Sequence, residues 1–133
     1  MEGQNEHNFL LLQRLLLHSR PVLLAKFESL LPHGTSLQTW KPTAKELKEA
    51  RLSRIQTSII KQRSPEQFDT ALLIILLRSF SFKSDKNNPL WNVKDNNKIR
   101  DSGDIADIVR IRNLRNKVCI LFVLLNVNVL VKS

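Results

Sequence analysis

The feature that most restricts how this chain can fold is a stretch that would be apolar on every face of a helix. It runs from Ala71 to Leu77 and reads Ala-Leu-Leu-Ile-Ile-Leu-Leu. The preceding Ser64-Pro65-Glu66-Gln67 is a good helix start, with a hydroxyl N-cap, a proline at the first position and a glutamine at the third. A helix that is apolar all round is surrounded by other elements. We therefore expect a central helix from Phe68 to Phe82, with these residues among the most buried: Leu72, Ile75 and Leu76.

The segment from about Asn5 to Leu31 has apolar residues at helical spacing on one stripe, namely Phe9, Leu12, Leu16, Leu23, Phe27 and Leu30. Leucines also fall every seven residues from Leu10 to Leu31, as in a leucine zipper. No second apolar row accompanies them, and Pro21 would remove an internal hydrogen bond. The pattern therefore favours a core helix that is kinked near Ser19–Pro21 and ends before Gly34.

Further helical patterns occupy residues 45–63 and 105–118, and polar or irregular segments separate them. Leu37 and Trp40 predict a short turn with an aromatic anchor. Residues 83–100 predict a long exposed loop pinned by Leu90 and Trp91. With only three Gly and five Pro in 133 residues, long elements are favoured over many short strands. The sequence thus predicts an all-α bundle of about four to five helices over residues 5–119.

The apolar tail of residues 120–133, ILFVLLNVNVLVKS, differs in character from what precedes it. It is rich in β-branched residues, nearly uncharged and only weakly periodic, so it could continue a helix or form a strand-like end. It is also too short for a membrane span, which needs about 20 apolar residues.

Charge is the main compositional guide to partners. Lys and Arg number 21 against 12 Asp and Glu, a formal net charge of +9, which favours association with polyanions such as RNA. On the helix predicted for residues 45–63, Lys48, Arg51 and Arg54 form a basic stripe. A phosphate-facing surface and an ordinary solvated face both explain it, and the absence of interleaved aromatic residues favours the solvated face.

Neither a metal site nor a cofactor site is expected. The three histidines lie at positions 7, 18 and 33 without ligand spacing, and the three glycines are isolated, so no glycine-rich phosphate loop exists. Cys119 is the only cysteine, which is typical of a reducing compartment. The polar N-terminus does not resemble a signal peptide. We expect an intracellular, cytoplasmic protein without a membrane partner.

The most informative motif is the segment from Ile105 to Cys119, IADIVRIRNLRNKVC. It resembles the last long helix of HEPN domains of the type found in the DAZ-interacting, RNA-binding ubiquitin ligase and in many invertebrate proteins. Segments resembling the earlier helices of that group support it: residues 8–12, 23–32, 35–38 and 67–78. The resemblance covers roughly residues 5 to 119 and implies an all-α HEPN-like fold.

The resemblance also implies where a functional site would lie. In the family, an Arg-Asn pair is followed three residues later by a Gly-His step, and ribonuclease members use the Arg to bind phosphate and the His as acid and base. Arg115 and Asn116 match the pair and are the candidate phosphate or groove contacts. Ile120 and Leu121 stand where Gly and His are expected, and no histidine follows His33.

We therefore expect no catalytic residues and a non-catalytic interaction module. Its partner would be a protein or RNA, it would form a homodimer through the last helix, and it would be a fragment of a larger ubiquitin-ligase-like or immune-type protein. An alternative is a metal-independent ribonuclease with Asp104 or Asp107 as base, although acids in a first turn also suit the helix dipole. A further alternative is a membrane-tethered peptide using the tail. The change after Cys119 also suggests a truncated copy with an altered splice or gene-model end.

Overall fold

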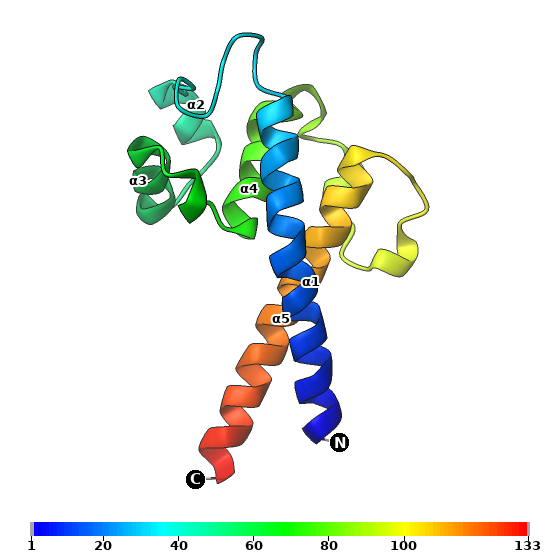
Figure 1. The fold of residues 1–133 in the computed structure, drawn as a ribbon. Coiled ribbons are helices and arrows are strands. Elements are labelled where there is room, and N and C mark those ends of the chain that lie inside the picture. Colours follow the sequence, from blue (N-terminus) through cyan, green and yellow to red (C-terminus); the bar gives the residue numbers. More distant parts are fainter. Residues whose placement is uncertain (1, 133) are drawn as a thin grey trace. The chain divides into compact units, whose positions relative to one another are not determined.

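The computed structural model describes the backbone of residues 2–132 and the side chains of residues 6–125. Within residues 2–132 it is helical and contains no strand, which confirms the predicted all-α class (Figure 1). The α-helices are α1 (Glu2–Ser29), α2 (Ala44–Glu49), α3 (Arg54–Gln62), α4 (Thr70–Leu76) and α5 (Asp104–Lys132). Shorter helical turns are η1 (Pro65–Gln67), η2 (Leu77–Ser81), η3 (Lys83–Asp85), η4 (Pro89–Asn92) and η5 (Asn96–Lys98).

The chain divides into two compact units. The first unit comprises Met1–Ser19 and Pro89–Ser133, and the second unit comprises Arg20–Asn88. Helix α1 passes through Pro21 without ending and so contributes to both units. Each unit is described separately below.

The core of the second unit is built on α4 and the π-helical turn η2. Asp69 caps α4, because its carboxylate accepts the backbone N–H of Leu72 at 2.8 Å. The buried side chains of α4 and η2 are Leu72, Leu73, Ile74, Leu76 and Leu77. The prediction was right for Leu72 and Leu76 and wrong for Ile75, which is half-exposed. Ala71, Ile75 and Arg78 share one stripe at helical spacing, and that stripe faces away from the core.

Residues 45–63, predicted as one helix, form two. Helix α2 ends at Glu49, Arg51 adopts the left-handed backbone conformation with φ of 54°, and α3 begins at Arg54. Each helix has a capping box, one made by Thr43 and Glu46 and the other by Ser53 and Gln56. The basic stripe of Lys48, Arg51 and Arg54 is therefore not carried by one continuous helix, which corrects the prediction.

The α2 capping box also affects the ionisation of its acid. The backbone N–H of Thr43 donates to the Glu46 carboxylate at 3.0 Å and lowers the pKa of Glu46 below its ordinary value. Burial acts in the opposite direction and is the second-largest influence, while the Thr43 hydroxyl and the charge of Lys83 add to the lowering of the pKa. A helix of only six residues is too short to be stable through its own hydrogen bonds, so these caps matter for where it starts.

Two long-range contacts hold α1 within the second unit. Trp40 packs edge-on between Phe27 and Phe80, with ring centroids 5.1 and 5.2 Å apart, which confirms its predicted role as an aromatic anchor. Arg20 donates from Nε to the carbonyl of Phe68 and from Nη2 to the carbonyl of Pro65, both at 2.7 Å. The second contact pairs the Phe68 carbonyl and adds a donor to the Pro65 carbonyl, which already accepts from the Phe68 N–H within η1.

The first unit is organised around α5, which continues as one helix beyond Cys119 to Lys132 (Figure 1). Its buried face carries Ala106, Ile108, Val109 and Val118. Trp91, only 2% exposed, pins the preceding loop as predicted, and Ile99 is buried as well. Phe9 of α1 lies beside Phe122 of α5, with ring centroids 6.1 Å apart.

Truncating the core of the second unit should destabilise the protein much more than altering its surface. Leu76 is fully buried, so Leu76→Ala removes apolar contacts and leaves a cavity, with an expected loss of about 2–5 kcal/mol in the free energy of unfolding. Lys48→Ala, at an exposed site, should stay within about 0.5 kcal/mol of the parent. Urea titrations followed by circular dichroism measure both, and equal losses would show that α4 is not the core element.

Candidate functional site

Helix α5 carries two Arg-Asn pairs three residues apart, in the run Arg112-Asn113-Leu114-Arg115-Asn116. A spacing of three turns the two pairs by about 60° from each other around the helix, so they need not meet the same surroundings. In the structure the first pair holds the loop before α5, and the second pair is the one expected from the resemblance to match the family motif.

The first pair binds backbone groups of the segment between η4 and η5. The Arg112 guanidinium donates from Nη1 to the carbonyl of Trp91 and from Nη2 to the carbonyl of Val93, the latter at 2.8 Å. The Asn113 amide donates to the same Val93 carbonyl at 3.1 Å and to Oδ1 of Asn96 at 2.8 Å. These bonds pair carbonyls that have no partner in regular secondary structure, so Arg112 and Asn113 act mainly as structural residues.

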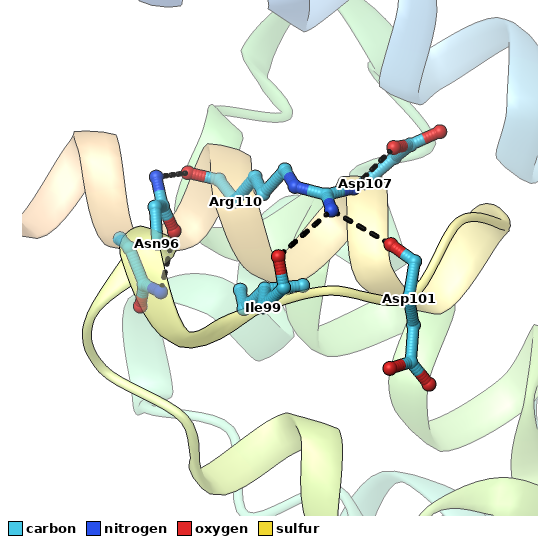
Figure 2. Close-up of polar contacts among 6 residues, drawn as sticks. Asn96, Ile99, Asp101, Asp107 and Arg110 are labelled. Carbon is cyan, nitrogen blue, oxygen red and sulfur yellow. Dashed lines mark hydrogen bonds and ion pairs between the residues drawn. The ribbon is translucent and has the colours of Figure 1, made fainter.

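One turn earlier, Arg110 fixes the end of the same loop (Figure 2). Its Nη2 donates to the carbonyl of Asp101 at 2.7 Å and more weakly to that of Ile99 at 3.4 Å. Its Nη1 pairs with Asp107 at 3.0 Å, and its own carbonyl accepts from the Asn96 amide at 3.3 Å. The side chain and the backbone carbonyl of Arg110 thus both bind the loop and attach it to the start of α5.

The side chains of the second pair, Arg115 and Asn116, do not bind the loop that the first pair holds. Arg115 is half-buried and Asn116 is exposed, and the guanidinium donates to the Asn116 amide oxygen at 3.3 Å. Leu121 lies six residues further along the same helix, about 9 Å along the axis, and is half-buried. The expectation that the three residues share one helix is confirmed, whereas a groove beside Arg115 stays a prediction.

The two acids considered as alternative bases lie in the first turn of α5, where the helix dipole favours negative charge. Asp107 is engaged by Arg110, and its side chain is exposed. In the part of the chain that the structure describes, no three His, Cys, Asp or Glu side chains gather as metal ligands would.

The basic residues predicted as a stripe are dispersed within the second unit. Lys48, Arg51 and Arg54 are all exposed. Arg51 borders an open pocket formed with η2, whereas Arg54 borders another lined by α3 residues such as Lys61. The structure therefore brings Arg51 together with cations that the sequence pattern did not group with it.

Comparison with known proteins identifies the family. The DZIP3/hRUL138-like HEPN family model matches residues 22–122, about three quarters of the chain, and the match includes Ile120 and Leu121. The chain belongs to this HEPN family, as the resemblance of its last helix implied. No curated protein and no solved structure matches it significantly. Among the described residues, no helix combines the length and the apolar character that crossing a membrane requires.

The structural role of Arg112 and Asn113 was missed in the sequence. The signal that could have found it is the repeated Arg-Asn pair, because two identical pairs on one helix invite the question of which one is structural. Nothing in the spacing alone identifies carbonyls of Trp91 and Val93 as the partners, since these lie about 20 residues away in an irregular segment.

Replacing Arg112 and Arg115 one at a time should show that Arg112 contributes to stability and that Arg115 does not. Arg112→Ala leaves the Trp91 carbonyl without its side-chain donor and the Val93 carbonyl with Asn113 alone, with an expected loss of about 1–3 kcal/mol. Arg115→Ala removes only a contact to the neighbouring Asn116 and should change stability by less than about 0.5 kcal/mol. Urea unfolding measures both, with hydrogen exchange of residues 91–96 as a local readout. A larger loss for Arg115→Ala would contradict this division.

Proposed function

We propose that this chain is a non-catalytic HEPN-type helical interaction module. The observation that carries the proposal is Leu121, which lies within the matched residues 22–122 and stands where the resemblance expects the motif histidine. A leucine cannot transfer a proton, and acid–base catalysis typically contributes about 10²–10⁴-fold to a rate. Arg115 can still hold a phosphate through a charge-assisted fork. Phosphate binding that is equally strong in the ground state and in the transition state does not lower the barrier to RNA cleavage.

The acids on α5 are poor substitutes for the histidine. Asp107 precedes Arg115 by eight residues, about 12 Å along the helix axis, and its carboxylate is paired with Arg110. Asp107 is also on the N-terminal side of Arg115, whereas the resemblance places the proton-transfer group on the C-terminal side, at position 121. This geometry supports the inactive interpretation over the ribonuclease alternative.

The surface that this module offers to a partner lies on the first unit. Large apolar side chains of α1 and α5 are exposed there, and they are Leu10, Leu11, Leu15, Leu17, Ile120, Phe122, Val123 and Leu124. Single exposed leucines are ordinary, but so many on two helices of one unit are typical of an interaction surface. The heptad leucines Leu10 and Leu17 are 59% and 68% exposed, so they are available to a second helix.

We take a second copy of the chain as the partner of this surface. A two-fold interface places the same patch against itself, and both helices present mainly aliphatic side chains that are compatible with self-pairing. The interface would include α5 and so would follow the predicted dimer through the last helix. A protein partner of another kind would use the same side chains, and the mass measurement below separates the two.

The purified chain should not cleave single-stranded RNA. Fluorophore-quencher RNA incubated with the parent should give the same rate as with Arg115→Ala, because neither holds a proton-transfer group beside the phosphate. His18→Ala belongs in the same experiment, since His7 and His18 are the histidines of the first unit. Cleavage by the parent that disappears in Arg115→Ala would overturn the inactive interpretation.

Restoring the motif is the complementary test of the site. The double change Ile120→Gly and Leu121→His supplies the missing residues on the same helix as Arg115. We expect measurable cleavage that Arg115→Ala removes again, if the acid–base group is what the site lacks. The matched control is Ile120→Gly with Leu121→Gln, which has the same backbone change without the imidazole. Cleavage by the glutamine control equal to that of the histidine variant would contradict the proposal.

Charge placed in the apolar surface should dissociate the dimer. Ile120 on α5 is 61% exposed, and Ile120→Lys would bury an unpaired ammonium in the interface. Ile55 on α3, 74% exposed in the second unit, gives the matched control Ile55→Lys. Sedimentation velocity should give twice 15.4 kDa for the parent and for Ile55→Lys, and the monomer mass for Ile120→Lys. A monomeric parent would refute self-association.

A further inference from the structure

A basic pocket of the second unit lies apart from the motif on α5. It is an open cavity of about 400 Å³, many times the roughly 30 Å³ that a water occupies in the liquid. Residues 49–51, at the end of α2 and just after it, form one wall of the pocket. Helix α4 and the turn η2 form a second wall, and residues 86–87 after η3 form a third. The lining residues are Glu49, Ala50, Arg51, Ile75, Arg78, Ser79, Lys86 and Asn87.

The chemistry of the pocket suits an anion. Three cationic side chains, Arg51, Arg78 and Lys86, line it against one carboxylate, that of Glu49. Ser79 and Asn87 add a hydroxyl and an amide, which are neutral hydrogen-bond donors. The surrounding unit has the same sign, since Arg20–Asn88 contains twelve Lys and Arg against six Asp and Glu, giving +6 of the total of +9. An anion entering the pocket is therefore attracted by near and distant charges together.

Arg51 is the residue whose conformation most needs an explanation. Its φ of 54° places it in the left-handed region just after α2, a position where glycine is the usual residue because side chains are disfavoured there. Its side chain is exposed and makes no hydrogen bond or ion pair with any residue in the described part of the chain. Arg63 shares the same φ, but its guanidinium donates to the carbonyl of Gln38 at 3.0 Å. Arg51 has no such structural use.

Arg78 forms a fixed wall of the pocket. Its Nε and Nη2 both donate to the carbonyl of Lys86, at 3.0 and 2.8 Å. This pairing ties η2 to the segment after η3 and brings the side chains of Arg78 and Lys86 to the same cavity. A cation whose position is already fixed loses little conformational freedom when a ligand binds, so it favours binding more than a mobile lysine does.

We propose that this pocket binds a backbone phosphate of single-stranded RNA, with Arg78 as the fixed contact and Arg51 and Lys86 as the movable ones. Guanidinium groups match the oxygens of a phosphodiester, and the excess positive charge over the whole unit suits a polymer that presents one charge per nucleotide. No aromatic side chain lines the pocket, so the contact is to the backbone and tolerates any base sequence. An acidic peptide would offer carboxylates at irregular spacing, and it serves as a competitor below.

The site lies in the second unit and does not involve Arg115, so the inference goes beyond the proposed function and does not depend on it. RNA binding would persist whether or not the chain cleaves RNA or dimerises. The two proposals are tested by different residues, Arg51 for this pocket and Arg115 with Leu121 for the motif.

The test compares two arginines of the same unit. Fluorescence anisotropy with a labelled oligouridine of about 12 nucleotides, within the usual site size, measures binding at about 50 and 200 mM KCl. Arg51→Gln should weaken binding roughly three- to tenfold at the lower salt and reduce the salt slope by about 0.7–1, as loss of one phosphate contact does. Arg54→Gln, an exposed arginine on the other pocket, is the matched control and should change binding by less than about twofold.

A second variant keeps the test independent of folding. Arg51→Gly removes the guanidinium at a backbone position that glycine tolerates better, so its melting temperature should equal or exceed that of the parent while RNA binding falls as in Arg51→Gln. Equal losses for Arg51→Gln and Arg54→Gln would mean diffuse charge and would overturn the pocket. So would the absence of RNA binding at low salt. Displacement of the RNA by polyglutamate at equal charge concentration would overturn the nucleic-acid assignment.

Discussion

The bonds from Arg112 and Asn113 to the carbonyls of Trp91 and Val93 are the constraint on which the first unit depends. The segment before α5 has only short helical turns, so its backbone carbonyls must find partners outside regular structure. By accepting from α5, they attach that segment to the helix and bury Trp91 against it. The motif residues one turn later on α5 are therefore carried by a helix whose position is already fixed by other side chains.

Much of the fold could be predicted because its strongest signals are local. The apolar run of α4 predicted the central helix, and Trp40 was recognised as an anchor. The predicted helix start at Ser64 was wrong, because Pro65–Gln67 form the separate turn η1, Ser64 makes no capping hydrogen bond, and Asp69 caps α4 instead. Ile75 was misplaced because an apolar run does not show which stripe faces outward; Arg78, one turn later, indicates the side. The break between α2 and α3 was missed although Thr43-x-x-Glu46 and Ser53-x-x-Gln56 are both visible capping boxes. A left-handed turn at arginine rather than glycine gives no warning in the sequence.

The candidate site followed from the resemblance and not from composition. The family match covers residues 22–122 and so includes Arg115, Asn116 and Leu121, while the roles of these residues rest on the resemblance. What could not be predicted was which side chains meet in space. Arg51, Arg78 and Lys86 are up to 35 positions apart in sequence, and only the turn at Arg51 and the hydrogen bonds of Arg78 bring them to one cavity. Periodicity along one helix instead grouped Arg51 with Arg54, which borders a different pocket.

The two arginine sites differ in what an anion could gain from them. At Arg115 a phosphate would meet a guanidinium with a leucine, and not a histidine, at position 121, so in the proposed function binding there would stabilise the ground state without accelerating a reaction. At Arg51 a phosphate would meet fixed and movable cations in a unit that carries +6 of the net charge, an arrangement that favours binding alone. In the proposed function, a leucine at the position of the motif histidine would remove the chemistry of the motif without removing the electrostatic basis for holding RNA. RNA affinity by itself is then no sign of a residual nuclease, because the charge responsible for it lies mainly in the other unit.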